Sequence, residues 1–290
     1  MERKFWNKLR ILVTNQCNYR CPFCHNEGQG KSARTQMMDF AKFQTFVDYL
    51  NGQEISELHF SGGEPFLNKD IVRMIQYVND NTSWGIGCAT NLSRITETQI
   101  SELARTRIKF NIQFPYANSL LFNTSTGNGD FAHIIRQLKL VRLANIPVGL
   151  NAVVQNENIQ NIEELLLFAI ENEVALKLLP QIGLNNSCAF KEQIYPLLER
   201  FAIKYIDKGT GATRWTVQIN GKATTVLYID SPCFTKDIST CRMFGELRIH
   251  PDFKVQPCIM KREQACIDLS KGKSEVIKEL SLLWNNFKKC

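Results

Sequence analysis

Three cysteines near the amino terminus are the side chains of this sequence best suited to metal chemistry. Cys17, Cys21 and Cys24 lie in the stretch CNYRCPFC, directly after the apolar run LRILVT at residues 9–14. A four-iron cluster has four metal corners that cysteines commonly hold, so three thiolates would leave one iron open for a small ligand. A structural zinc site takes four protein ligands and would need a fourth from elsewhere in the chain. The spacing favours the open iron cluster, with zinc as the alternative.

A glycine-rich turn supplies a second group of polar atoms one predicted strand later. Gly62, Gly63, Glu64 and Pro65 close the stretch ELHFSGGEP. Two glycines let a backbone approach its neighbour closely, and a glutamate can accept a hydrogen bond from an ammonium group. Gly-Gly and Glu-Pro are ordinary turn dipeptides, but this turn follows the cysteine loop by one strand. That placement favours a shared site over coincidence.

Three more cysteines fall in the last third of the chain. Cys233, Cys241 and Cys258 bracket a predicted hairpin formed by ELRIH and KVQPC. Spacings this loose suit a second metal site that holds either an iron–sulfur cluster or zinc. Cys266 could add a fourth ligand, which would change the role of that site from substrate binding to electron transfer or structure.

The elements that must position these residues alternate along the chain. Short β-branched runs suited to buried parallel strands are separated by segments of helical period. The predicted strands are residues 9–14, 57–62, 84–90, 107–114, 146–154 and 175–180, and the predicted helices are residues 41–50, 68–80, 95–104, 130–144 and 158–171. Six such units imply an α/β fold, a partial (β/α)6 TIM barrel that is two units short of closure. Gln113 and Gln181 fall at strand ends, where such folds place their active residues.

The pattern changes after a helical segment around residues 191–205. The alternating runs TRWTVQI and ATTVLYI are joined by Asn220-Gly221, which is a strong hairpin signal. The hairpin formed by ELRIH and KVQPC follows. We therefore predict a barrel domain at residues 1–212 and a small carboxyl-terminal region at residues 213–290, built from β-hairpins and the second metal site.

Composition and net charge indicate the general class of protein and the kind of partner to expect. The chain has 290 residues, of which 44% are hydrophobic, enough to bury one large core. No stretch approaches the ~20 apolar residues of a membrane helix, and no export signal is recognisable, which predicts a cytoplasmic protein with reduced cysteines. The net charge of +7 favours an anionic partner. Neither a membrane nor a stable nucleic-acid partner is expected.

On these motifs the chain resembles the radical S-adenosylmethionine (SAM) superfamily. The resemblance implies that Cys17, Cys21 and Cys24 hold a [4Fe-4S] cluster whose open iron chelates the amino and carboxylate groups of SAM. It also implies an enzyme that cleaves SAM reductively to methionine and a 5′-deoxyadenosyl radical, which then takes a hydrogen atom from the substrate. A protein such as flavodoxin or ferredoxin would supply the electron.

The same resemblance nominates residues that bind SAM. The GGEP turn would receive the methionine amino group. The stretch TNLS is similar to a T-N-G motif of the family, with Leu92 in place of glycine, and nominates Asn91. The stretch VGLNAVV nominates Asn151 to face the ribose or the carboxylate. The alternative for each asparagine is an ordinary loop or strand-end hydrogen bond. No residue is assigned a catalytic role.

Most of the chain is similar to the GTP cyclase family of molybdenum-cofactor biosynthesis, including its auxiliary-cluster ("twitch") appendage, which is related to SPASM-type regions. The likeness implies that Cys233, Cys241 and Cys258 hold a second [4Fe-4S] cluster, with zinc still the alternative. It also implies substrate-binding roles for Arg10 and Arg248.

The chain departs from this family at several positions. Seven residues separate Cys233 from Cys241 where the family has two, and Glu57 and His59 stand where the family has basic residues. A triphosphate would lose charge-assisted contacts there. We therefore predict hydrogen abstraction from a nucleotide-like or other small anionic substrate, which starts a cyclisation, carbon–carbon bond formation or rearrangement. The alternatives are peptide modification and, less favoured, a non-catalytic iron–sulfur or zinc protein.

Overall fold

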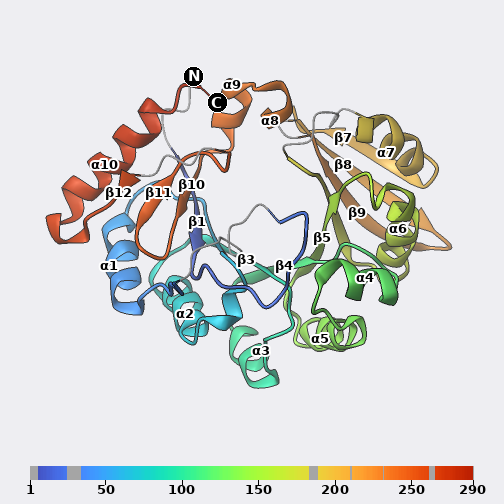
Figure 1. The fold of residues 1–290 in the computed structure, drawn as a ribbon, viewed down its shortest axis with the longest axis horizontal. Coiled ribbons are helices and arrows are strands. Elements are labelled where there is room, and N and C mark those ends of the chain that lie inside the picture. The colour runs from blue at the N-terminus through green and yellow to red at the C-terminus, as the bar shows by residue number, and fades with distance from the viewer. Residues whose placement is uncertain are drawn as a thin grey trace.

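The six predicted strands form the centre of one curved sheet in the computed structural model, which describes residues 6–24, 34–182, 189–209, 211–230, 232–260 and 265–289 (Figure 1). Neighbouring strands from β1 to β6 are parallel, as the alternation of strands and helices requires. Within the described residues the sheet stays open, in the order β12-β11-β10-β1-β2-β3-β4-β5-β6-β9-β8-β7, so the predicted partial barrel is confirmed. The strands are β1 (Lys8–Leu12), β2 (Glu57–Ser61), β3 (Gly85–Thr90), β4 (Ile108–Gln113), β5 (Val148–Val154), β6 (Ala175–Pro180), β7 (Ala202–Asp207), β8 (Ala212–Ile219), β9 (Lys222–Ile229), β10 (Glu246–Ile249), β11 (Lys254–Gln256) and β12 (Ala265–Cys266).

Helices cover the outer, convex face of the sheet (Figure 1). Several begin at side chains that cap them: Asp39 accepts a hydrogen bond from the backbone N–H of Lys42, and Thr96 forms a reciprocal capping box with Gln99. The helices are α1 (Phe40–Leu50), α2 (Ile71–Asn81), α3 (Glu97–Leu103), α4 (Ser119–Thr126), α5 (Phe131–Leu143), α6 (Ile162–Glu171), α7 (Ala189–Glu199), α8 (Pro232–Thr235), α9 (Ile238–Met243) and α10 (Lys273–Asn286), with 3₁₀ turns at Pro65–Leu67, Ile159–Asn161 and Leu269–Lys271. None of the helices in the described chain is long and apolar enough to cross a membrane.

Alternation along each strand separates the core from the concave face. In β1, Leu9 and Ile11 are buried beneath the helices, whereas Arg10 lines the cavity on the inner face. The same alternation in β2 buries Leu58 and Phe60 and turns His59 inward. Polar side chains from every second position of the strands therefore collect on one surface, which is where a substrate cavity can form.

The two predicted hairpins are both present, and they lie on opposite sides of the barrel. Strands β8 and β9 pair through a two-residue turn at Asn220 and Gly221, whose φ values of 50° and 82° match the turn that Asn-Gly predicts. Strand β9 extends the sheet beside β6, whereas β10 extends it beside β1. The segment that contains α8 and α9 carries the chain from one group of strands to the other (Figure 1).

The predicted helix around residues 191–205 is too long. Helix α7 ends at Glu199, and β7 begins at Ala202. The run AIKYID is rich in β-branched and aromatic residues, and Tyr205 pairs in register with Trp215 of β8, so sheet pairing overrides the helical pattern. The division into domains at residues 1–212 and 213–290 stays a prediction, because strands from both sides of that boundary share one sheet.

Candidate active site

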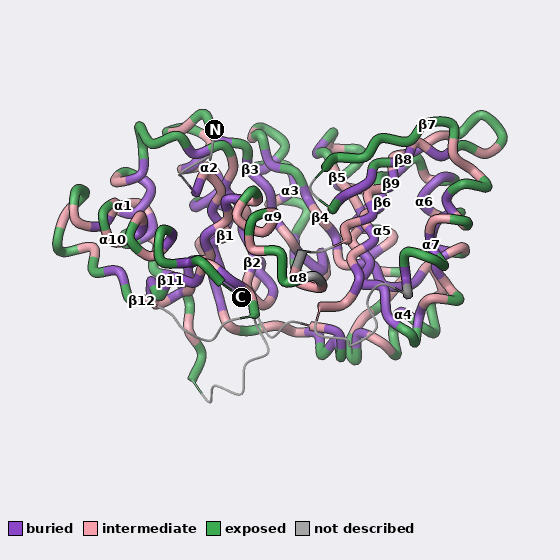
Figure 2. The backbone as a smooth tube through the Cα atoms, turned by 90° about the horizontal axis from the view of Figure 1, so that it is seen from above, coloured by how far each residue is buried: buried purple, intermediate pink, exposed green. Residues whose placement is uncertain are grey.

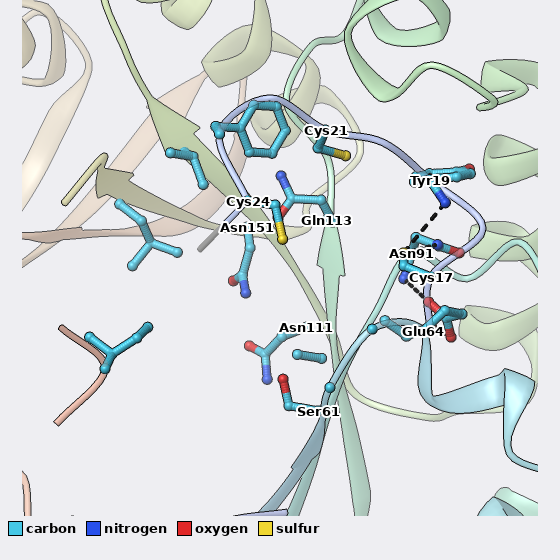
Figure 3. A pocket seen from close by; sticks show the side chains of 18 of the residues that line it. Cys17, Tyr19, Cys21, Cys24, Ser61, Glu64, Asn91, Asn111, Gln113 and Asn151 are labelled. Carbon is cyan, nitrogen blue, oxygen red and sulfur yellow. Dashed lines mark hydrogen bonds between the residues drawn. The ribbon is translucent and has the colours of Figure 1, made fainter. Parts of the chain in front are cut away.

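A cavity of about 400 Å³ lies on the concave face, at the carboxyl ends of the parallel strands (Figure 3). The three cysteines of the first loop line one end of it. The side chains of Arg10, Lys177 and Arg248 line the other end, which we call the floor. A cavity of this size is in the range of small-molecule sites, and its two ends differ in chemistry.

The cysteine loop is held by short-range contacts after β1. The backbone N–H of Tyr19 donates to the Sγ of Cys17 at 3.4 Å, and the N–H of Cys24 donates to the carbonyl of Cys21 at 3.2 Å. The pKa of Cys17 is raised to about 11 and that of Cys21 to about 12, mainly by burial. Nearby negative charge contributes to both values, from Glu64 and Cys24 at Cys17 and from Cys17 and Cys24 at Cys21. Metal binding would therefore release protons from these thiols.

Among the described residues, no three His, Cys, Asp or Glu side chains lie close enough together to hold a metal ion. This applies to both groups of three cysteines. Cys17, Cys21 and Cys24 nevertheless border one cavity from a single loop, and thiolates are the usual ligands of iron–sulfur clusters. These three residues fit a cluster with one open iron, and their assignment as ligands stays a prediction.

The GGEP turn packs directly against the cysteine loop. The N–H of Gly63 donates to the carbonyl of Thr14 at 2.9 Å, and the N–H of Glu64 donates to the carbonyl of Gln16 at 2.8 Å. A Cβ atom at Gly63 would overlap the backbone of Gln16, so glycine is required for this approach. The two motifs therefore form one structural unit, as their positions in the sequence predict.

The buried side chain of Glu64 connects the GGEP turn to the loop after β3 through hydrogen bonds. Its side chain is only 1% exposed, and its carboxylate accepts hydrogen bonds from the N–H of Phe66, the hydroxyl of Thr90 and the N–H of Asn91. Burial raises the pKa of Glu64, and the hydrogen bonds from Asn91, Thr90 and Phe66 oppose that rise. The structure thus gives Glu64 a bracing role between the β2 and β3 loops, and its contact with SAM stays a prediction. Pro65 begins the 3₁₀ turn that follows.

Asn91 contacts the cysteine loop. Figure 3 shows Asn91 beside Cys17, whose Sγ lies 4.0 Å from Asn91 Nδ2. The same Nδ2 donates to Asn18 Oδ1 at 3.0 Å, and Asn91 Oδ1 accepts from Ser93. Leu92, which stands where the family has glycine, adopts a left-handed φ of 64° and is fully buried. A left-handed φ is strained for leucine and not for glycine, and the burial of the Leu92 side chain offsets this backbone strain. Asn91 therefore supports the loop, and a direct contact with SAM stays a prediction.

Gln113 and Asn151 are polar residues of the cavity wall. They are paired in register on β4 and β5, Asn151 is also in register with Lys177 of β6, and both line the cavity. Among the described residues, neither Gln113 Nε2 nor Asn151 Oδ1 has a hydrogen-bond partner, although both atoms are buried. A buried polar atom without a partner is costly, so a donor and an acceptor side by side fit a bound polar ligand such as SAM.

The floor contains an ion-pair cluster that links β1 to β10. Arg10 makes a bidentate pair with Glu246, with Nε–Oε1 and Nη2–Oε2 distances of 3.0 Å, and Arg248 Nη2 lies 2.9 Å from Glu246 Oε1. Burial alone would raise the pKa of Glu246, but the two guanidinium groups lower it to about 2. The predicted substrate residues Arg10 and Arg248 are thus brought together, around a carboxylate that the sequence did not single out.

Lys177 is a second floor residue that sequence reasoning missed. Its Nζ donates to Asn111 Oδ1 at 3.3 Å, and burial lowers its pKa. One signal was available: Lys177 is the only charged residue in the apolar strand ALKLLP. Glu246 gave a weaker signal, because it shares a strand face with Arg248 but its pairing across to Arg10 depends on the sheet order.

Two of the carboxyl-terminal cysteines lie on the segment that joins the two hairpins, and the others follow the second hairpin. Cys233 is on α8, Cys241 is on α9, and Cys258 follows β11 and is 5% exposed. Cys266 is exposed on β12. The second metal site stays a prediction. Three further residues of metal-binding type, His25, Cys188 and Cys290, lie outside the described residues.

Comparisons with known proteins agree with this geometry. Residues 11–169 match the family model described as the radical SAM superfamily. The chain is 27% identical over 271 residues to the probable GTP 3′,8-cyclase of Pyrococcus abyssi, covering 88% of this chain and 85% of that protein. It is 28% identical over 169 residues to the uncharacterized protein MJ0907 of Methanocaldococcus jannaschii, covering 56% of this chain and 58% of that protein.

Solved structures share the fold. Streptococcus suis SuiB bound to SAM superimposes with a TM-score of 0.72 at 14% identity, and SuiB bound to the precursor peptide SuiA with a TM-score of 0.71 at 15% identity. Both matches cover 97% of this chain and about two thirds of SuiB, 66% and 65% respectively. The family implies an enzyme with a [4Fe-4S] cluster and SAM. The family match, which spans more than half of the chain, shows that this protein belongs to the radical SAM superfamily.

Proposed function

We propose that this radical SAM enzyme abstracts a hydrogen atom from a nucleotide-like or other small anionic substrate and so starts a cyclisation, carbon–carbon bond formation or rearrangement. One observation carries the proposal: a single cavity connects the three cysteines of the first loop to a floor of cationic side chains. A substrate anchored on that floor would extend towards the cofactor end. The relatives named GTP 3′,8-cyclase support a nucleotide as the substrate class.

The chain's own residues would divide the work between the two ends. Cys17, Cys21 and Cys24 would hold the cluster, and Gln113 and Asn151 would bind polar groups of SAM with their unpaired atoms. When bound, the cluster and SAM supply the radical that abstracts hydrogen. The GGEP turn would fix the cysteine loop and enclose the cofactor.

The floor would orient the substrate. Arg10, Arg248 and Lys177 give the floor a net positive charge even with Glu246 among them, so the floor attracts an anionic group. A charge-assisted hydrogen bond there would fix such a group more strongly than neutral contacts do. Fixing the anionic group at one end of the cavity would hold the reacting carbon at the other end. Positioning of this kind accounts for much of the rate enhancement in reactions where the cofactor carries the difficult step.

The carboxyl-terminal region would supply a second cluster. In this proposal Cys233, Cys241 and Cys258 are its ligands, and Cys266 is a candidate fourth ligand. Residues 213–290 then act as an auxiliary-cluster region beside the barrel. A small protein such as flavodoxin or ferredoxin would deliver the electron to the first cluster.

Anaerobic reconstitution with iron and sulfide tests the proposed function. We expect about eight irons per chain, corresponding to two four-iron clusters. Addition of reductant and SAM should yield 5′-deoxyadenosine, and a pool of nucleotides that includes GTP should stimulate its formation and give a new product. The absence of 5′-deoxyadenosine under competent reduction would contradict the proposal and favour a binding protein.

Peptide modification is the second candidate function, and one surface favours it. Strand β7 is an edge of the sheet and exposes Ile203, Tyr205 and Ile206 (Figure 2). An exposed edge strand can pair with an extended peptide. SuiB bound to its precursor peptide shares this fold. Turnover of a peptide pool without turnover of nucleotides would favour this second candidate over the first.

A further inference from the structure

We propose that Glu246 sets the charge selectivity of the floor: it occupies Arg10 and Arg248 as an internal carboxylate, so that Lys177 binds a single anionic group of the substrate. This inference rests on the proposed function and deepens it. The substrate would carry one carboxylate or one phosphate monoester, and a triphosphate would be disfavoured.

Glu246 uses both carboxylate oxygens inside the floor. Oε1 accepts from the Nε of Arg10 and lies 2.9 Å from Nη2 of Arg248, and Oε2 accepts from the Nη2 of Arg10. The side chain is only 20% exposed, so these pairs are shielded from solvent. A bidentate pair of this kind is the geometry in which arginine binds a substrate carboxylate or phosphate. Glu246 therefore occupies the positions that a polyanion would need.

The net charge of the floor also disfavours the binding of a polyanion. The two arginines and Glu246 together carry one net positive charge, and Lys177 adds a second. Glu57 lies beside the floor, 3.7 Å from Lys8 and 3.0 Å from His59, and its negative charge offsets the charge of Lys8. A triphosphate would bring more negative charge than this floor neutralises, and burying unpaired charge is costly. A phosphate monoester, with a charge of about −1.5 to −2 at pH 7, nearly matches this positive charge, and a carboxylate leaves about one positive charge in excess.

Lys177 and Asn111 form the remaining anion site. Among the described residues, no carboxylate is ion-paired with Lys177, whose ammonium group instead donates to the side-chain oxygen of Asn111. The amide N–H groups of Asn111 can then donate to the same anion that Lys177 attracts.

Nucleotide binding tests the inference independently of catalysis. The probes are GTP, GMP and the guanosine derivative with a 5′-carboxylate, titrated calorimetrically into the anaerobic, cluster-loaded protein with SAM present. The wild-type protein should bind GTP no more tightly than GMP. In Glu246→Gln, two guanidinium groups are released, and we expect the preference for GTP over GMP to rise about tenfold, with a steeper dependence on salt. The carboxylate probe distinguishes the two kinds of anionic group.

Glu57→Gln is the matched control, because it removes one negative charge beside the same floor without touching Arg10 or Arg248. It should leave the preference unchanged, and an equal effect of both variants would show that only net charge matters and overturn the inference. Lys177→Met should weaken GMP or the carboxylate probe about tenfold. This variant tests the second half of the inference even if Glu246→Gln does not fold.

Three further outcomes decide the matter. A wild-type preference for GTP over GMP of tenfold or more, an identical preference in wild type and Glu246→Gln, or no binding of any probe to any variant would each overturn the inference. Formation of 5′-deoxyadenosine, measured in the same samples, reports on the proposed function separately. Its loss in the wild-type protein would contradict the function, whereas the binding ratios would still report on Glu246.

Discussion

The two ends of the cavity are built in different ways. At the cysteine end, the GGEP turn and the cysteine loop are joined by backbone hydrogen bonds and by glycines that allow close approach. At the floor, Arg10 and Glu246 are 236 residues apart and meet through their side chains. Short motifs thus specify the end that would hold the cofactor, whereas the order of strands specifies the end that would hold the substrate.

The largest effect should come from the cysteine end. Cys24→Ala would remove one of three predicted cluster ligands, and we expect loss of about four irons per chain and no 5′-deoxyadenosine. Iron analysis and chromatography of the reaction measure both. Cys88→Ala is the control, since Cys88 is fully buried in β3 away from the predicted ligands and should retain iron and cleavage. Unchanged 5′-deoxyadenosine formation by Cys24→Ala would refute the ligand assignment.

A change in the carboxyl-terminal region should separate cleavage from product formation. In Cys258→Ala we expect the iron content to fall by about four per chain, most uncoupled SAM cleavage to remain and the product to disappear. The reason is that the second cluster would act on the substrate and not on SAM. Full product formation by this variant would show that the cavity works without the second site.

The sequence predicted the elements whose signals are local. The six strands, the Asn220-Gly221 hairpin and the GGEP turn follow from alternation, turn chemistry and motif spacing. Helix α10 was not predicted, although Val276, Leu280 and Trp284 repeat at helical spacing and are buried. These features depend on residues that are close together in the chain.

The floor could not be predicted in full, because its contacts depend on which strands become neighbours. The sequence showed Arg10 and Arg248 only through a resemblance, and it gave no reason for β10 to pair beside β1. The position of Glu246 between the two arginines follows from that pairing. Similarly, the interaction of Lys177 with Asn111 joins β6 to β4 across β5. The sequence identified the charged side chains, whereas the order of the strands determined which of them contact one another.

The floor should also be recognisable in the pH dependence of stability. The pKa of Glu246 is about 2 in the folded protein, below its ordinary value of 4.5, so the ionised carboxylate stabilises the fold at pH values above 4.5. We expect Glu246→Gln to lower the free energy of unfolding by about 2 kcal/mol at pH 7. This difference should shrink as the pH falls from 4.5 towards 2. Urea unfolding of both proteins between pH 7 and pH 3 measures it, and a difference that stays constant to pH 3 would contradict the assigned ion pairs.

The smallest effect on stability should come from the region between the two ends. Asn151 Oδ1 is buried without a partner among the described residues, so Asn151→Ala removes an unsatisfied polar atom and should change the free energy of unfolding by less than about 1 kcal/mol. If SAM supplies the missing partner, its affinity should nevertheless fall about tenfold, measured by anaerobic equilibrium dialysis of the cluster-loaded protein.

Asn158, which is fully buried in the loop after β5, gives the opposite expectation. Asn158 donates to the carbonyl of Val153 at 2.7 Å and accepts from the N–H of Gln155 at 2.8 Å, so its polar atoms are already paired. Asn158→Ala should therefore destabilise the fold by about 2 kcal/mol and leave the affinity for SAM unchanged. If both variants lost stability equally and neither lost affinity, Asn151 would be a structural residue. In that case SAM would contact only the loops at the cysteine end, and the ends of the strands would contact the substrate.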